Sequence, residues 1–133
     1  MSPHYVLDTF AVMAYLRGEA GGEAVRDLLR RAQGKEIALS LCLVNYGEVL
    51  YVTERAGGLE AATEAVRIVE QLPLKISSVD RALTFAAAHI KAQYPISYAD
   101  AFAVALAQEL GATVVTGDPE FRSVEGLVSV QWL

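Results

Sequence analysis

The sequence has little cysteine and a deficit of positive charge. Its single cysteine, Cys42, excludes an internal disulfide and a cysteine-rich zinc site, and the neighbouring Leu41 and Leu43 indicate a small buried side chain. The 11 lysines and arginines are outnumbered by 16 aspartates and glutamates, which gives a net charge of −5. This balance argues against binding of nucleic acid by bulk positive charge, but it leaves open binding through bound cations.

Long hydrophobic runs are also missing. No run approaches the roughly 18 to 20 residues that a membrane span needs, and the amino terminus lacks the basic stretch and apolar segment of a signal peptide. We therefore expect a cytoplasmic protein without membrane contact. The chain has 133 residues, of which 53% are hydrophobic and 20% charged. Such a composition predicts one folded domain, residues 1–133, with a substantial core rather than a disordered chain.

Short apolar runs rich in β-branched residues alternate with long helical stretches. This alternation is typical of a parallel sheet, and the nearly continuous apolar character of the runs indicates helices on both faces. The sequence thus predicts an α/β fold, a three-layer α/β/α sandwich around a central, mostly parallel five-stranded sheet. The expected strands are His4–Leu7, Ile37–Leu41, Leu74–Ile76, Thr113–Thr116 and Val128–Trp132.

Apolar residues spaced three and four apart predict the helices. One helix is expected to begin after Gly57-Gly58 and to end at Pro73. Another runs from a cap at Asp80 toward Pro95. Two further helices, Leu43–Arg55 and Ala99–Leu110, are apolar almost all round, so we expect both to be buried against the sheet or against a partner.

Four carboxylates stand out by their positions. Asp8 follows the first strand and Asp118 follows the strand at 113–116. In a parallel sheet both strand ends lie on the same edge, which is where open α/β sheets bind ligands. Asp100 lies at the start of the helix 99–110, and Glu48 lies within the helix 43–55.

Three of these acids also fit a purely structural role as helix caps. Asp8 opens a helix, Asp100 completes a capping box that begins at Ser97, and Asp118 is followed by a proline. Glu48 is harder to explain in this way, because the residues three and four positions away are mostly apolar and an unpaired buried carboxylate is costly.

Four acids that converge on one sheet edge would repel one another unless cations were bound there. Ligands that are all oxygen select hard ions such as Mg²⁺ or Mn²⁺. Such ions hold a phosphodiester, lower the pKa of a bound water and stabilise the leaving oxygen. The pattern therefore favours phosphodiester hydrolysis.

Four segments containing these acids carry a family resemblance. In order and spacing they resemble the PIN-domain ribonucleases, particularly the VapC-type toxins of prokaryotic toxin–antitoxin pairs, and the likeness extends from about His4 to the carboxyl terminus. The segments are Val6–Thr9, Asn45–Glu48, Ser97–Ala101 and Thr116–Phe121.

The resemblance implies a metal-dependent endoribonuclease, the toxin of a type II toxin–antitoxin system. It implies that a catalytic pocket binds Mg²⁺ or Mn²⁺ through Asp8, Glu48, Asp100 and Asp118. Thr9, Asn45 and Thr116 would then orient the ligands or the water, although local capping and turn bonds explain them equally well. The implied partners are an RNA substrate, a second copy in a homodimer, and a cognate antitoxin that covers the pocket.

The sequence departs from the family pattern at two positions. Phe10 stands where many relatives have a small, often hydroxyl-bearing residue, and we expect it to narrow the mouth of the pocket or to remove a hydrogen bond. The fourth segment offers two acids, Asp118 and Glu120, of which Asp118 is at the better matching position. A non-catalytic PIN-like module that binds RNA or protein is the alternative function, and the intact acids favour the enzyme.

Two surface features have more than one interpretation. The basic cluster in residues 26–35 predicts either contacts to RNA phosphates at the rim of the pocket or a solvated helix face; it comprises Arg26, Arg30, Arg31 and Lys35. Several apolar side chains fit either a protein interface or core packing; these are Phe10, Met13, Leu16, Tyr46, Leu50 and Tyr51.

Overall fold

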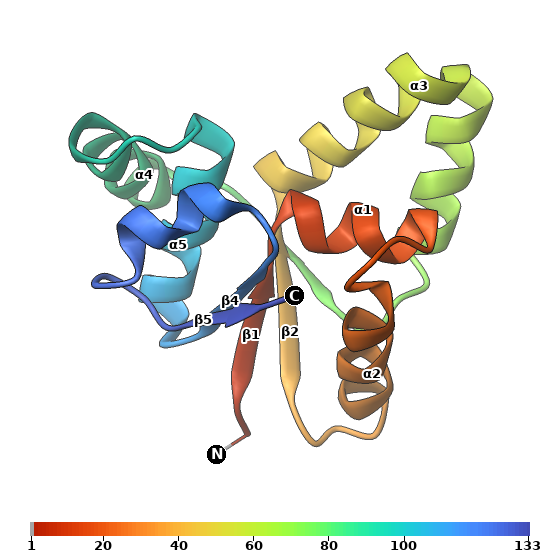
Figure 1. Cartoon of the computed structure of the whole chain (residues 1–133), viewed down its shortest axis with the longest axis horizontal. Coiled ribbons are helices and arrows are strands. Elements are labelled where there is room, and N and C mark those ends of the chain that lie inside the picture. Colours follow the sequence, from red (N-terminus) through yellow and green to blue (C-terminus); the bar gives the residue numbers. More distant parts are fainter. Residues whose placement is uncertain (1) are drawn as a thin grey trace.

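A five-stranded sheet forms the centre of the computed structural model, which describes residues 2–133 (Figure 1). Its strands are β1 (His4–Leu7), β2 (Ala38–Cys42), β3 (Lys75–Ser77), β4 (Thr113–Thr116) and β5 (Val130–Trp132). They lie in the order β3-β2-β1-β4-β5, and every pairing is parallel. The predicted sheet is confirmed, with the largest difference at the last strand, which begins at Val130 rather than Val128.

Within residues 2–133, five α-helices and one 3₁₀ helix connect the strands. They are α1 (Thr9–Arg17), α2 (Gly22–Gln33), α3 (Leu43–Val69), α4 (Arg81–Gln93), α5 (Tyr98–Leu110) and η1 (Pro119–Val124). The element α3 contains both of the helices that the sequence predicts on either side of Gly57-Gly58. Gly58, at φ 84° and ψ 176°, reverses the chain, so that α3 rises away from the sheet and returns (Figure 1). Within residues 2–133, no helix is long and apolar enough to cross a membrane.

The two faces of the sheet are covered by different helices. Val6 and Val114 belong to a core cluster with α4, α5 and η1. Leu7 and Val115, which follow them in the strands, belong to the other cluster, with α1, α2 and α3. This alternation is the two-residue period of a strand. It confirms the three-layer sandwich, in which β1 and β4 form the centre of both cores.

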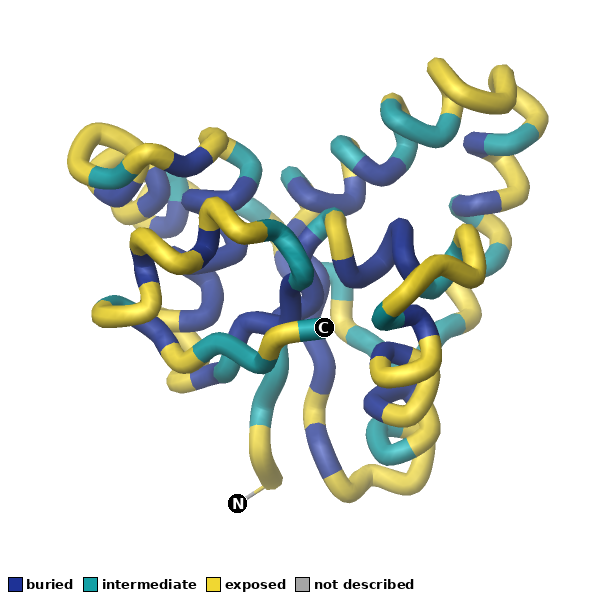
Figure 2. Tube along the Cα trace, viewed as in Figure 1, coloured by how far each residue is buried: buried dark blue, intermediate teal, exposed yellow. Residues whose placement is uncertain are grey.

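Burial separates the apolar residues whose role the sequence left open. Met13 and Tyr46 are buried in the core, whereas Phe10 and Tyr51 remain exposed to 42% and 48%. The helix α5 is buried over eight consecutive residues, 100–107, as its apolar sequence predicts. Figure 2 shows that the inner parts of the helices are buried and that the turn of α3 is exposed.

The basic cluster lies along α2 and the loop after it. Arg26, Arg30 and Lys35 are exposed. Because α2 ends at Gln33 and the chain then enters the start of β2, this end of α2 lies toward the amino edge of the sheet (Figure 1). Of the two interpretations, contact with RNA at the rim of a pocket at the carboxyl edge therefore does not fit Lys35 and the end of α2. A solvated helix face explains the cluster.

Close packing of α1 against the start of α2 leads to a first prediction. A Cβ atom at Gly22 would lie 2.6 Å from the carbonyl oxygen of Ala14, whereas one at Gly47 would meet nothing within 4 Å. We expect Gly22→Ala to lower the free energy of unfolding by roughly 1–3 kcal/mol through overpacking. The matched change Gly47→Ala, within α3, should raise it by roughly 0.5–1 kcal/mol. Urea unfolding of both variants measures this, and equal stability of the two would contradict the packing.

Candidate metal centre

Asp8 is held at the point where the central strands end. It follows β1, and its neighbour Leu7 pairs with Val115 of β4. One carboxylate oxygen, Oδ1, accepts a hydrogen bond of 2.8 Å from the backbone N–H of Ala11 and so caps α1. The other, Oδ2, accepts a hydrogen bond from the hydroxyl of Thr116. Asp8 is thus both the predicted helix cap and a member of the predicted acidic edge.

The Asp8 carboxyl is almost completely buried, and this changes its protonation. Burial raises its pKa to about 7, although the hydrogen bonds from Thr116 and Ala11 act to lower it. The charges of Asp100 and Asp118 raise the pKa further. The site therefore disfavours negative charge on Asp8 unless a positive charge is nearby.

Asp118 and Glu120 are placed by the turn between β4 and η1. The backbone N–H of Asp118 donates to the Thr116 hydroxyl at 3.0 Å, and Asp118 Oδ1 accepts from the backbone N–H of Glu120 at 3.0 Å. Pro119 occupies the first position of η1, as the sequence predicts. Through its hydroxyl, Thr116 connects the carboxylate of Asp8 with the backbone of Asp118.

Asp100 faces these acids from the first turn of α5. The hydroxyl of Ser97 caps this helix and accepts a hydrogen bond of 3.1 Å from the backbone N–H of Asp100. Burial raises the pKa of the Asp100 carboxyl to about 7, and the charge of Asp118 is the next largest cause. One carboxylate oxygen from each of Asp100, Asp118 and Glu120 lies within 4.8 Å of the other two.

A pocket of about 300 Å³ contains all four acids that the sequence singled out. It lies at the carboxyl ends of β1 and β4, where the strand order changes direction. Glu48 reaches it from the first half of α3, and its carboxylate accepts a hydrogen bond of 3.4 Å from the Tyr51 hydroxyl. The lining residues are Asp8, Thr9, Phe10, Glu48, Val52, Ser97, Asp100, Asp118 and Glu120.

The closest group of carboxylates differs from the predicted set. It contains Asp100 and Asp118 together with Glu120, whereas Asp8 and Glu48 line the same pocket outside this group. The sequence offered Asp118 and Glu120 as competing positions, and the structure brings both to the pocket. The hydrogen bond from the N–H of Glu120 to the Asp118 cap is the local feature that links them.

Asn45 joins three helices beneath the pocket. Its side chain is fully buried, and Nδ2 donates to the hydroxyl of Thr9 at 3.2 Å and to the carbonyl of Ala99 at 3.1 Å. Thr9 in turn donates to the backbone carbonyl of Asn45 at 3.4 Å. The side-chain oxygen of Asn45 has no partner among the described residues. These contacts fix α1, α3 and α5 relative to one another beside the acids.

The donor set of the pocket fits a hard divalent cation. Its polar side chains offer only oxygen, and five of them are carboxyls. Burial and mutual repulsion raise the pKa of Asp8 and of Asp100 to about 7, so a bound cation would relieve the cost of ionising both. A bound cation would also attract a negatively charged group, such as a phosphodiester, to a pocket whose carboxylates otherwise repel it.

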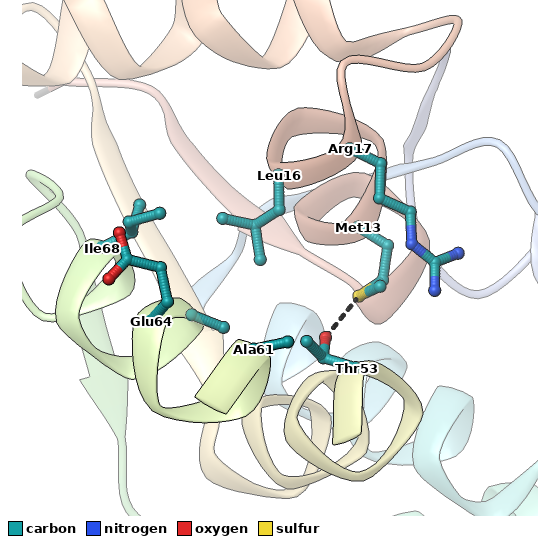
Figure 3. A pocket seen from close by; sticks show the side chains of 8 residues that line it. Met13, Leu16, Arg17, Thr53, Ala61, Glu64 and Ile68 are labelled. Carbon is teal, nitrogen blue, oxygen red and sulfur yellow. Dashed lines mark hydrogen bonds between the residues drawn. The ribbon is translucent and has the colours of Figure 1, made fainter. Parts of the chain in front are cut away.

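A second pocket lies between α1 and α3 and has a different character (Figure 3). Its volume is about 210 Å³, and Met13 and Leu16 line it opposite Ile68. The Thr53 hydroxyl lies 3.7 Å from the sulfur of Met13. Glu64 is the single carboxylate in the lining, and it pairs with the exposed Arg67. The lining of this pocket is mostly apolar, and its described residues offer no set of metal ligands.

Comparisons with known proteins agree with this architecture. One similar structure is that of VapBC2 from Rickettsia felis, bound to a DNA fragment from the VapBC2 promoter. The TM-score is 0.75 and the sequence identity is 18%, and the alignment covers 96% of this chain and 97% of that chain. The values for DNA-bound VapBC from Salmonella typhimurium are 0.74 and 19%, covering 98% of both chains. For VapC20 from Mycobacterium tuberculosis, a sarcin-ricin loop cleaving toxin, they are 0.71 and 21%, covering 90% and 94%.

These similarities to solved structures show the fold of the chain. A match to a protein-family model shows the family to which the chain belongs. A search of curated proteins gave no significant match. Residues 5–127 match the family model of the PIN domain, which includes every acid of the pocket. Because this match spans nearly all of the 133 residues, the chain belongs to the PIN domain family.

Proposed function

We propose that this protein is a metal-dependent endoribonuclease, the toxin of a type II toxin–antitoxin pair. The observation that carries the proposal is the convergence of Asp100, Asp118 and Glu120 within 4.8 Å, in a pocket that Asp8 and Glu48 also line. Membership of the PIN domain family supports it. So does the similarity in fold to a toxin that cleaves the sarcin-ricin loop.

In the proposed site, Mg²⁺ or Mn²⁺ is held by Asp8, Glu48, Asp100 and Asp118, with Glu120 as a fifth carboxylate. When bound, such an ion supplies charge neutralisation for a phosphodiester and activation of water. Asp8 keeps its orientation because both of its oxygens accept hydrogen bonds. Thr116 and Asn45 act through their neighbours: Thr116 orients Asp8, and Asn45 holds Thr9 beside it.

Two carboxyls of the pocket can hold or release a proton near neutral pH. In the metal-free protein the pKa of Asp8 and that of Asp100 are both about 7. A cation held by these carboxylates would lower both pKa values and would keep Asp8 and Asp100 ionised as its ligands.

The proposal includes partners. The structures of similar fold include VapBC complexes, which supports a cognate antitoxin for this chain. A basic antitoxin segment would complement the acidic pocket. Exposed apolar side chains on α3 and at the start of α5, Tyr51 and Tyr98 among them, support a homodimer. RNA is the proposed substrate, and the cytoplasm the proposed place of action.

Metal binding is testable without knowledge of the RNA. We expect Mn²⁺ to stabilise the wild type against heat: for a dissociation constant of about 1 mM, roughly 10 mM metal adds about 1.4 kcal/mol. Asp100→Asn should lose most of this stabilisation. Asp80→Asn, which alters the cap of α4 away from the pocket, is the matched control and should keep it. An equal response of wild type and Asp100→Asn to Mn²⁺ would overturn the proposed site.

The protonation of Asp100 predicts a pH dependence of stability without metal. Its pKa is about 7 in the folded chain and about 3.9 in the unfolded chain, so the folded chain binds more protons between these values. The wild type should therefore lose stability relative to Asp100→Asn as the pH rises from about 4 to 7. By pH 8 the variant should be more stable by roughly 1–2 kcal/mol, allowing for solvent screening.

Urea unfolding in the presence of a chelator measures this difference. Asp80→Asn again serves as the control, and its stability relative to wild type should not change in the same way with pH. A constant difference between wild type and Asp100→Asn from pH 4 to 8 would show that the Asp100 carboxyl is not destabilised by its surroundings.

Cleavage of RNA tests the function itself. With Mn²⁺ and a mixed pool of cellular RNA, we expect new 5′ ends that disappear on chelation. Loss of groups that merely support metal ligands costs about 10- to 100-fold, so Asp100→Asn and Asp118→Asn should lose about 100-fold or more. Glu120→Gln should also impair cleavage if Glu120 is a ligand, and Asp80→Asn should not. RNA binding without cleavage by the wild type would favour a non-catalytic module.

A further inference from the structure

Phe10 is a large apolar side chain on the wall of an acidic pocket. It lies in the first turn of α1, next to Thr9, and 42% of the residue is exposed. Single exposed hydrophobic residues are ordinary on protein surfaces, so exposure alone decides nothing. Its location is more specific: within residues 2–133, Phe10 is the one aromatic residue among those that line the pocket with Asp8 and Glu48.

The ring of Phe10 packs against Gly117. A Cβ atom at Gly117 would lie 2.3 Å from Cε1 and 2.6 Å from Cζ of the ring, so a larger residue there would displace the ring from this position. Gly117 stands between Thr116 and Asp118, which are part of the acidic edge. The turn that orients the carboxylate of Asp118 therefore also provides the surface against which the ring packs.

We infer that Phe10 stacks on a nucleobase next to the phosphodiester bound at the acidic pocket. The inference rests on the proposed function and deepens it, because it assigns to Phe10 the contact with a base of the RNA substrate. Unpaired RNA bases are bound mainly by stacking on aromatic side chains, and every base has a face suited to this contact. The carboxylates beside Phe10 repel phosphate and have no stacking surface, so the ring complements them.

The probes are adenosine 5′-monophosphate and ribose 5-phosphate, which share a sugar phosphate and differ in the base. Dissociation constants are measured by calorimetry in the presence of Mn²⁺. The wild type should bind the nucleotide about 5-fold or more tightly than the sugar phosphate, the lower end of what stacking contributes. Phe10→Leu should abolish this preference and leave the affinity for ribose 5-phosphate unchanged.

Two further variants separate stacking from a structural effect. Phe10→Tyr keeps an aromatic ring and should keep the preference. Phe85→Leu removes another exposed aromatic ring, on α4, whose exposure is 63%, and should also keep it. Thermal unfolding of all variants checks that each is folded.

The failure of this inference is distinguishable from the failure of the proposed function. Equal binding of both probes by the wild type, or a preference for the nucleotide that survives Phe10→Leu, would overturn the role of Phe10 while leaving the metal site intact. If Mn²⁺ neither stabilises the wild type nor promotes binding of either probe, the proposed phosphodiester site itself fails, and the stacking role fails with it.

Discussion

Burial of mutually repelling carboxylates at the carboxyl edge of the sheet is the constraint on which the site depends. Five acids line one pocket in a chain of net charge −5, and three of them lie within 4.8 Å. The cost is visible in Asp8 and Asp100: burial first, and then the charges of the neighbouring acids, raise the pKa of each to about 7. A fold that brings these groups together favours either their protonation or a bound cation, and this choice links stability, metal binding and the proposed chemistry.

Backbone hydrogen bonds hold the acids in place despite this repulsion. Asp8 and Asp118 each accept a hydrogen bond from a backbone N–H at the start of a helix. The hydroxyl of Ser97 likewise accepts a hydrogen bond from the backbone N–H of Asp100. Capping and ligand roles are therefore compatible, because a carboxylate that accepts one N–H retains other lone pairs for a cation. The helices that begin here also bury the core, so the stability of the fold and the geometry of the site depend on the same bonds.

The pocket combines two kinds of surface. Its carboxylates suit a cation and, through it, a phosphate, whereas the Phe10 ring packed against Gly117 offers an apolar face. Small polar side chains behind them, Asn45 and Thr116, connect α1, α3, α5 and the end of β4. In this arrangement the phosphate and the base of a nucleotide would be bound by different groups that lie side by side in one pocket.

The sequence by itself determined the fold class, the five strands, the caps at Asp80 and Ser97 and the four candidate acids, because periodicity and capping are local properties. It treated Asp118 and Glu120 as alternatives, whereas both lie in the pocket, and it could not place the Phe10 ring on Gly117, 107 positions away in the chain. The tertiary structure decided these contacts, and it placed the end of α2 away from the pocket. Distances between side chains on different elements depend on strand order and helix packing, which local patterns do not encode.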